Sequence, residues 1–203
     1  MIFVIVPLGK EARDIAHWVI RVVMYTAAST VGAALLAMVL GMVGAGLHAM
    51  LPAIGYQWAT ALLGLSALVY ALHELNIIHL PAPQVGWQVP KSWQRSSRLL
   101  GNTLYGFVLG MGIFTFIPFA SFYLLLMWEV TAGAVDLRAA AMLGAIYGAF
   151  RGLPAVLGGI SMLRGVYPLP VSNWLLAHLG WWHAINGLAL LLVGGFLLGS
   201  FVV

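Results

Sequence analysis

One arginine and one glutamate are the residues of this sequence whose type and position could do chemistry inside a membrane. Arg151 lies in the segment YGAFRGLP and has no charged residue within twelve positions on either side. Glu74 is the only carboxylate inside a predicted apolar span. Tyr147 lies four residues before Arg151, and the same spacing separates Tyr70 from the glutamate, so each tyrosine shares a helical face with its charged neighbour. The sequence therefore predicts an interhelical polar cluster of these four residues.

An arginine near the middle of a membrane helix is costly. Insertion scales put the cost at about 2.5 to 3.5 kcal/mol, and arginine cannot avoid it by losing its proton. The guanidinium must therefore face a partner, a group of carbonyl oxygens or water. We interpret Arg151 with Glu74 as a packing lock between helices, and the alternative is a substrate or ion site.

Pro118 lies midway along the predicted third span, where it removes one backbone donor and leaves carbonyl groups near Phe114 to find other partners. The sequence predicts a helix kink at this proline, with Thr115 and Ser121 close to it. A broken helix of this kind can bind substrate at the midplane of a transporter. Hydroxyl groups in membrane helices commonly bond back to their own helix, so we expect a static kink.

The residue types needed for most catalytic chemistry are missing from these 203 residues. There is no cysteine, which excludes disulfides, thiolate metal sites and thiol redox chemistry by the chain's own side chains. The six histidines show no spacing typical of a metal site, since His178 and His183 lie about 140° apart around a helix. Serine-nucleophile and phosphate-loop motifs are also absent. We expect no enzyme activity, no metal and no cofactor.

The composition is that of an integral membrane protein. Of the 203 residues 63% are hydrophobic and 7% are charged, with a mean hydropathy of +1.02, whereas a soluble domain carries about 25% charged residues. The net charge of +4 does not indicate nucleic-acid binding, because the basic residues lie mainly in short loops between apolar spans. We predict an all-α, multi-pass bundle in a single transmembrane domain over residues 1–203, with the lipid bilayer and other membrane subunits as its partners.

Five segments are long and apolar enough to cross a hydrocarbon core of about 30 Å. Proline and glycine in HAMLPAIGY separate the first from the second, and the polar loop 79–98 separates the second from the third. We expect residues 1–16 to lie at the membrane interface rather than to form a cleaved leader. The five predicted helices cover about residues 22–47, 57–78, 99–128, 139–163 and 177–201.

The distribution of cations predicts the orientation. With the N-terminus in the cytoplasm, seven cations lie inside and Arg138 alone lies outside, which is the positive-inside pattern of a five-helix protein with an N-in, C-out topology. Glu129 and Asp136 then fall in the outer loop. Tryptophans cluster at the predicted span boundaries, as in an aromatic belt. We expect a protein of the prokaryotic inner (plasma) membrane.

Glycines recur every four residues along three of the predicted helices, and such small-residue ridges let helix backbones approach closely. We interpret them as packing contacts within one bundle, with oligomer contacts or a flexible transport pathway as alternatives. The glycines concerned are Gly106 and Gly110, then Gly144, Gly148 and Gly152, and finally Gly195 and Gly199.

The third predicted span, LYGFVLGMGIFTFIPFASFYLLLMW, resembles the fourth helix of the CcdA/DsbD transmembrane family, inner-membrane proteins that carry reducing equivalents through a pair of cysteines. In that helix a glycine-rich run leads to a Pro-Cys element. Here the run leads to Pro118, and Phe119 occupies the position of the cysteine. Four further segments are similar to the family's second, third, fifth and sixth helices, in the order 25–47, LLGLSALVYALHELNIIHLP (62–81), LGAIYGAFRGLPAVLGG (143–159) and 181–199.

Two departures from the family pattern coincide with its redox cysteines. The cysteine of the fourth helix is replaced, and the family's first helix, which carries the other Pro-Cys, has no counterpart among these residues. Arg151 also stands where the family commonly has glycine. The resemblance therefore implies a shared core of helices and argues against thiol electron transfer, because two-electron thiol chemistry needs thiolates.

Three functions of different class are compatible with these observations. We favour a non-catalytic membrane subunit, a scaffold or assembly component of a larger membrane complex and a degenerate relative of the thiol-electron transporters. The alternative is a small-solute or metal-ion permease with Arg151, Glu74 and the Pro118 kink at its midplane site. The third is a thiol electron-transfer partner that uses another subunit's cysteines. A packing lock requires Arg151 to be buried, whereas a transport element requires it to line a water-accessible crevice.

Overall fold

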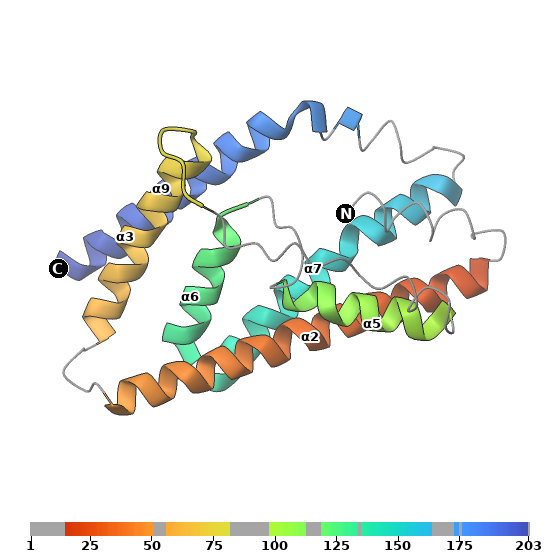
Figure 1. Cartoon of the computed structure of the whole chain (residues 1–203), viewed down its shortest axis with the longest axis horizontal. Coiled ribbons are helices and arrows are strands. Elements are labelled where there is room, and N and C mark those ends of the chain that lie inside the picture. Colours follow the sequence, from red (N-terminus) through yellow and green to blue (C-terminus); the bar gives the residue numbers. More distant parts are fainter. Residues whose placement is uncertain are drawn as a thin grey trace. The chain divides into compact units, whose positions relative to one another are not determined.

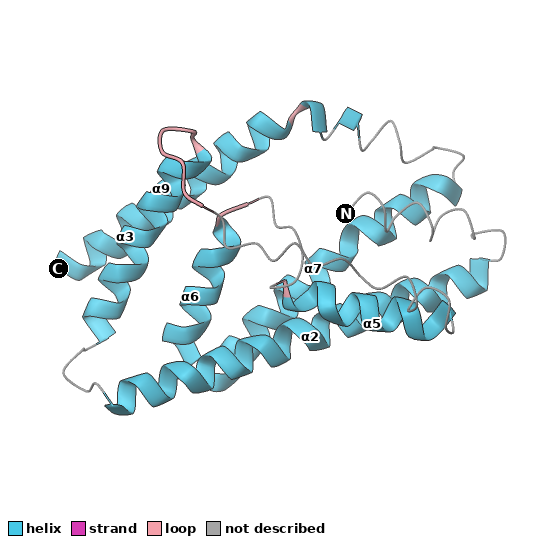
Figure 2. Cartoon of the chain, viewed as in Figure 1, coloured by secondary structure: helices cyan, strands magenta, loops and turns pink. Residues whose placement is uncertain are grey.

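The described part of the chain consists of α-helices. The computed structural model describes residues 15–50, 56–81, 98–112, 119–133, 135–163, 173–174 and 176–202, and no strand is present in these ranges (Figure 2). The all-α class predicted from the sequence is thereby confirmed. Six helices are delimited (Figure 1): α2, Ile15–Met50; α3, Tyr56–Glu74; α5, Arg98–Met111; α6, Ser121–Gly133; α7, Leu137–Leu163; and α9, Leu179–Val202.

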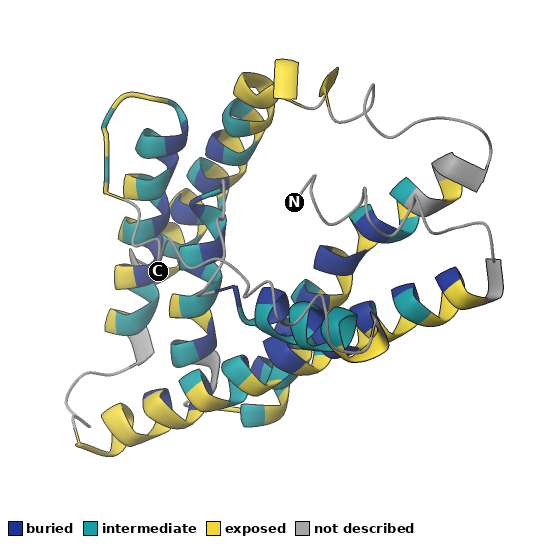
Figure 3. Cartoon of the chain, turned by 45° about the vertical axis from the view of Figure 1, so that its right-hand side comes forward, coloured by how far each residue is buried: buried dark blue, intermediate teal, exposed yellow. Residues whose placement is uncertain are grey.

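Three of these helices are long and apolar enough to cross a membrane. The qualifying segments are His17–Met50 in α2, Leu137–Gly158 in α7 and Leu179–Ser200 in α9, each at least 22 residues long. Many of their large apolar side chains are exposed (yellow in Figure 3), including Leu192 and Phe196, each 76% exposed. Apolar surface of this extent is stable against lipid and unstable against water. The chain is therefore a helical membrane protein.

Four of the five predicted spans correspond to single helices, namely α2, α3, α7 and α9. The largest difference is in α2, which has 36 residues and begins at Ile15, within the segment before the predicted first span. In contrast, α3 is shorter than predicted: it stops at Glu74, four residues before the predicted end of the second span. It stops there because Asn76 has a φ of 58°, a left-handed conformation that cannot continue a right-handed helix.

The predicted third span, 99–128, is not a single helix. α5 ends one residue before Gly112, which has a φ of 73°. Glycine adopts this left-handed conformation without strain, and its N–H closes the last turn by donating to the carbonyl oxygen three residues earlier at 3.0 Å. The next helix, α6, begins at Ser121. The helix thus already ends before the predicted kink, and Thr115 and Pro118 lie outside the described residues.

The described packing divides into two compact units, and the single transmembrane domain over residues 1–203 stays a prediction. Helices α2 and α7 each contribute residues to both units. Unit 1 comprises Met1–Leu35, Val85–Thr115 and Gly144–Ala177, and unit 2 comprises Leu36–Gln84, Phe116–Leu143 and His178–Val203.

In unit 1, α5 and α7 pack against α2 where glycines meet its backbone. A Cβ added at Gly106 would overlap the carbonyl oxygen of Tyr25, and one added at Gly110 would overlap that of Ser29. Gly148 of α7 faces the same Ser29 carbonyl. The Ser29 hydroxyl, which is fully buried, donates to the Gly148 carbonyl oxygen at 2.8 Å. Figure 1 shows α5 running along α2. The contacts of Gly110 and Gly148 place Ser29 where α5 and α7 both approach α2.

The other two predicted glycines of α7 are also inside the described packing. A Cβ at Gly152 would stand 2.7 Å from the Thr26 hydroxyl oxygen, and Gly144 is buried. The ridge of small residues on α7 therefore lies against α2 at least from Gly148 to Gly152.

In unit 2, α3 and α9 lie side by side (Figure 1). Leu63, Ala67 and Ala71, spaced four residues apart on one face of α3, form a buried core with Leu190 of α9 and Leu124 of α6. Both alanines have no exposed surface. Small residues at these positions allow the neighbouring helices to come close.

The glycine contacts of α9 differ from the predicted pair. A Cβ at Gly194 would lie 2.9 Å from the carbonyl oxygen of Gly64 on α3, and Gly187 is similarly tight against α3. Gly195 and Gly199, in contrast, would place a Cβ in open space. They are rotated about 100° and 140° around the helix from Gly194, so they face away from α3. The predicted packing role inside the bundle is corrected for these two residues.

A leucine at Gly110 should destabilise unit 1, because its side chain cannot enter without displacing the α2 backbone at Ser29. We expect Gly110→Leu to lower the free energy of unfolding by about 3 kcal/mol, as for severe overpacking. The matched control Gly195→Leu enters open space and should change it by less than about 0.5 kcal/mol. Denaturant titration of the detergent-solubilised protein, followed by circular dichroism, measures both; equal losses would contradict the described packing.

Candidate buried acid–histidine site

Glu74 is a buried acid of unit 2. It is the last residue of α3, and its side chain is 1% exposed. Its Oε1 accepts a hydrogen bond from the backbone N–H of Ala120, and its Oε2 pairs with Nδ1 of His183. These contacts join α3 to the start of α6 and to α9. A carboxylate buried this deeply needs such donors, because an unpaired charge would carry the full cost of leaving water.

Gly187 brings α9 close enough to α3 for this pairing. It lies one helical turn after His183, and a Cβ at this position would stand 2.9 Å from Leu75 Cγ and 3.3 Å from the carbonyl oxygen of Ala71. A larger side chain would push the two helices apart. The backbone contact at this glycine therefore determines whether the imidazole can reach Glu74.

The amide of Ala120 lies at the N-terminus of α6, directly before its first residue. The first N–H groups of a helix have no acceptor inside the helix, and they carry the positive end of its dipole. Glu74 supplies both an acceptor and a negative charge there. A side chain from α3 thus caps α6, which positions the start of that helix.

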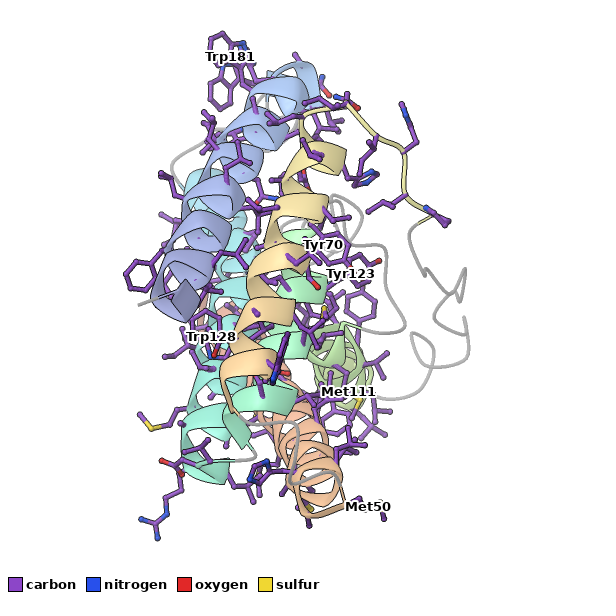
Figure 4. All side chains as sticks on the ribbon, turned by 90° about the vertical axis from the view of Figure 1, so that its left-hand side faces the viewer. Met50, Tyr70, Met111, Tyr123, Trp128 and Trp181 are labelled. Atoms are coloured by element: carbon purple, nitrogen blue, oxygen red, sulfur yellow. The ribbon has the colours of Figure 1, made fainter. Side chains whose placement is uncertain are left out.

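Aromatic rings border the acid–histidine pair. The ring of Phe119 lies 5.2 Å from that of His183, centroid to centroid, at a tilt of 51°. Tyr70, one turn before Glu74, stacks with Tyr123 of α6 at 6.0 Å (Figure 4). The carboxylate is enclosed, whereas the imidazole side chain remains 26% exposed. Any ligand would therefore meet the imidazole first.

The chain leaves Glu74 through a tight turn. Asn76 adopts the left-handed conformation, which asparagine tolerates better than most residues. The N–H of Leu80 donates to Nδ1 of His73 at 3.1 Å, so this second histidine of the region is bonded to the turn. Its role is structural.

Arg151 is the buried cation of unit 1, with 8% of its surface exposed. Its Nη1 donates to the hydroxyl of Tyr147, one turn earlier on α7, and its Cζ lies 5.7 Å from the centroid of that ring. The guanidinium is thus held by a phenol of its own helix. Elsewhere in unit 1 the rings of Tyr25 on α2 and Tyr105 on α5 stack at 6.2 Å.

The four residues of the predicted cluster lie in two settings. Tyr147 is bonded to Arg151 in unit 1, whereas Tyr70 lies one turn before Glu74 in unit 2. Within unit 2 both oxygens of the glutamate have partners of their own. A Glu74–Arg151 pair would join the two units, and it stays a prediction.

Three functional neighbours were missed by the sequence analysis. The sequence analysis considered His183 only as a metal ligand together with His178. The one sequence feature that could have indicated its role is Gly187, one turn later, because a glycine there allows another helix to approach closely. Tyr25 and Tyr105 flank the Gly106 contact between α2 and α5. No periodic pattern singles out these tyrosines, because many apolar and aromatic residues share their helices.

Glu129 is a second buried acid of unit 2. The sequence analysis placed it in an outer loop, but α6 continues to Gly133 and buries Glu129 to 2% exposure. Its Oε2 has no hydrogen-bond partner within the described residues. Among those same residues no three histidine, aspartate or glutamate side chains are close enough to hold a metal ion.

Packed apolar helices with buried charges held by neighbouring side chains define a helical membrane protein with internal polar sites. Among known proteins, the chain is similar to proteins described as methylamine utilization protein MauF. It is 30% identical to MauF of Paracoccus denitrificans over 176 residues, 85% of this chain and 59% of that protein. MauF of Methylorubrum extorquens is 31% identical over 200 residues, 96% of this chain and 66% of that protein.

These relatives are longer than the chain, which spans 59% of the length of the two Paracoccus proteins it matches. MauF of Methylobacillus flagellatus is 26% identical over 171 residues, with a similar coverage of 58%. No protein-family model matches the chain, and no solved structure matches it.

Replacing His183 by leucine should destabilise unit 2, because it removes one of the two donors from an enclosed carboxylate. Leaving a buried acceptor without one of its donors costs about 1 to 3 kcal/mol, and we expect His183→Leu to fall in this range because the Ala120 amide remains. The control His48→Leu, at an exposed position of α2, should cost less than about 0.5 kcal/mol. Denaturant titration in detergent compares them; a neutral His183→Leu would contradict the pairing.

Replacing Tyr147 by phenylalanine should destabilise unit 1. The variant keeps the ring but removes the hydroxyl that accepts from Arg151, and hydrogen bonds to charged groups contribute about 1.5 to 3 kcal/mol. The control is Tyr70→Phe, whose hydroxyl makes no hydrogen bond in the described part of the chain. The two free energies of unfolding should differ by at least about 1 kcal/mol.

Proposed function

We propose that the chain is a non-catalytic membrane subunit of a methylamine-utilisation system, a scaffold or assembly component for other membrane proteins. The observation that carries this proposal is its similarity to MauF over 85% and 96% of its own length. From the description of these relatives we take only the process, methylamine utilisation. The role within that process is our inference from the structure.

The buried charges are consistent with a scaffold. Arg151 donates to a tyrosine of its own helix, and both oxygens of Glu74 accept from α6 and α9. Each arrangement stabilises helix contacts within its unit. The Glu74 contacts resemble an interhelical lock, in which polar side chains hydrogen-bond across helices, whereas the Arg151 bond lies within α7.

The outer face of α9 is the surface that we propose for a partner helix. Gly195 and Gly199 form a small-xxx-small ridge in open space, between the exposed apolar side chains Leu192 and Phe196. Ridges of this type pack against a second helix in membranes, because bare backbones can come into van der Waals contact. The opposite face of the same helix is already occupied by α3.

We further propose kinship with the CcdA/DsbD family and a five-span, N-in topology in the bacterial inner membrane. Phe119, at the position of the family's cysteine, packs against His183. Because the chain has no cysteine, it cannot exchange thiols with its own residues. A role in thiol chemistry would need the cysteines of another protein.

Loss of the α9 ridge should abolish partner binding without unfolding the chain. We expect a stoichiometric membrane partner to copurify with the wild-type protein in mild detergent and to be lost from the double variant Gly195→Leu, Gly199→Leu. The matched control is Gly46→Leu on α2, which also enters open space and should retain the partner. Mass measurement of the purified complexes shows which variants retain the partner.

A permease is the second candidate, because Glu74, Glu129 and Arg151 are buried charges in apolar helices, and such charges often mark transport pathways. Reconstitution into liposomes separates the two functions. A monomer that purifies without partners and carries methylammonium across the bilayer would overturn the scaffold proposal.

A further inference from the structure

We propose that Glu129 is a proton-binding site, whose carboxyl group carries its proton at neutral pH in the packed protein. The proposal goes beyond the scaffold role and does not depend on it. It rests on three features of the described part of unit 2: the burial of the carboxyl group, the end of α6 at which it lies, and the positions of the other titratable side chains.

The carboxyl group is enclosed without a donor. Glu129 is 2% exposed, and its buried Oε2 accepts no hydrogen bond from the described residues. Directly after it, the Val130 carbonyl oxygen lies so close to Gly44 of α2 that a Cβ on this glycine would overlap it. Helix α2 thus presents bare backbone to this end of α6. An ionised carboxylate in such a setting would carry the full cost of leaving water, and a bound proton removes most of that cost.

The two buried acids of unit 2 lie at opposite ends of α6. Glu74 meets the N-terminal end, where the Ala120 amide donates to it and the helix dipole is positive. Glu129 lies about 13 Å farther along, in the last turns of the helix that ends at Gly133. There the final four carbonyl groups have no N–H partner within the helix, and the dipole is negative. The backbone of α6 therefore disfavours a negative charge on Glu129 and favours a proton.

The other titratable side chains around α6 lie elsewhere. Those of α3 and α9 lie toward the start of α6, where Tyr70 stacks with Tyr123 and Glu74 pairs with His183. The remaining members of that group are His73, bonded to the turn after α3, and His178, just before α9. Those of α2, α7 and the connecting segments are exposed, namely His48, His79, Asp136 and Arg138. Within the described ranges of unit 2, no cation is paired with Glu129.

A proton suits this site better than a metal ion does. A metal needs several ligands, and no three acidic or histidine side chains come together in the described ranges. A proton needs a single carboxyl oxygen. Val135 and Asp136, which follow α6 closely, are exposed, so a proton has a short route to the surface. The structure therefore assigns Glu129 the smallest cation.

Infrared spectroscopy of the full chain in detergent at pH 7 tests the site directly. A protonated carboxyl group has a carbonyl stretching band at higher frequency than a carboxylate. We expect such a band in the wild type, its loss in Glu129→Gln, and its retention in the matched control Glu74→Gln. Glutamine keeps the shape of the side chain and mimics the protonated acid. Glutamate labelled with 13C at the side-chain carboxyl assigns the band in the wild type without any substitution.

The pH dependence of unfolding is the second readout. A proton held more tightly in the folded protein than in the unfolded chain stabilises the fold at low pH, and this stabilisation is lost as the pH rises above the ordinary range of a glutamate, about 4.3. The unfolding equilibrium constant of the wild type, divided by that of Glu129→Gln, should therefore increase with pH, by up to about tenfold per pH unit. The same ratio for Glu74→Gln to the double variant Glu74→Gln, Glu129→Gln should increase equally.

Each outcome decides the inference. A wild type with no 13C-shifted band of a protonated carboxyl at pH 7 would overturn it, and this measurement stands even if Glu129→Gln fails to fold. A band that persists in Glu129→Gln but disappears in Glu74→Gln would place the proton on the other acid and also overturn it. Copurification of a partner is scored separately: a protein that keeps its partner but lacks the band refutes the proton site and leaves the scaffold proposal standing, whereas the converse refutes only the scaffold.

Discussion

The burial of the Glu74 carboxylate is the constraint on which unit 2 depends. A carboxyl group at 1% exposure needs hydrogen-bond partners, so the amide directly before α6 and an imidazole of α9 must lie at the same place. Three helices are thereby brought to one point by a single side chain. The apolar core of Leu63, Ala67 and Leu190 then packs at one side of this point, where non-directional contacts could not by themselves select a register.

Close backbone contact is what allows buried polar groups to reach partners on neighbouring helices. In lipid there is little hydrophobic drive for helices to associate, so van der Waals contact and interhelical hydrogen bonds must hold them. Gly187 serves this purpose for the Glu74–His183 pair, and Gly106 brings α5 onto the α2 backbone at Tyr25. The hydroxyl of Ser29 adds a buried hydrogen bond to α7. Each polar arrangement is therefore a consequence of small residues a turn or less away.

Helix α9 carries both the contact with α3 and the face that we propose for a partner helix. One of its faces packs on α3 through Gly187 and Gly194 and carries His183 to the buried acid, while another face presents Gly195 and Gly199 to open space. A partner bound to the outer face would contact the same helix that carries His183.

The sequence by itself determined the helical membrane class and the approximate extent of α2, α3, α7 and α9, because long apolar runs and their Gly-Pro interruptions are local properties of the chain. It also determined the pairing of Tyr147 with Arg151, since a spacing of four residues places them on one face. Only the tertiary structure decided that Glu74 pairs with His183 and the Ala120 amide, more than a hundred and more than forty residues away respectively. Helix rotation decided which glycines of α9 pack. In a helix that is apolar on all sides, periodicity carries no information about facing, so rotation depends on contacts with other helices.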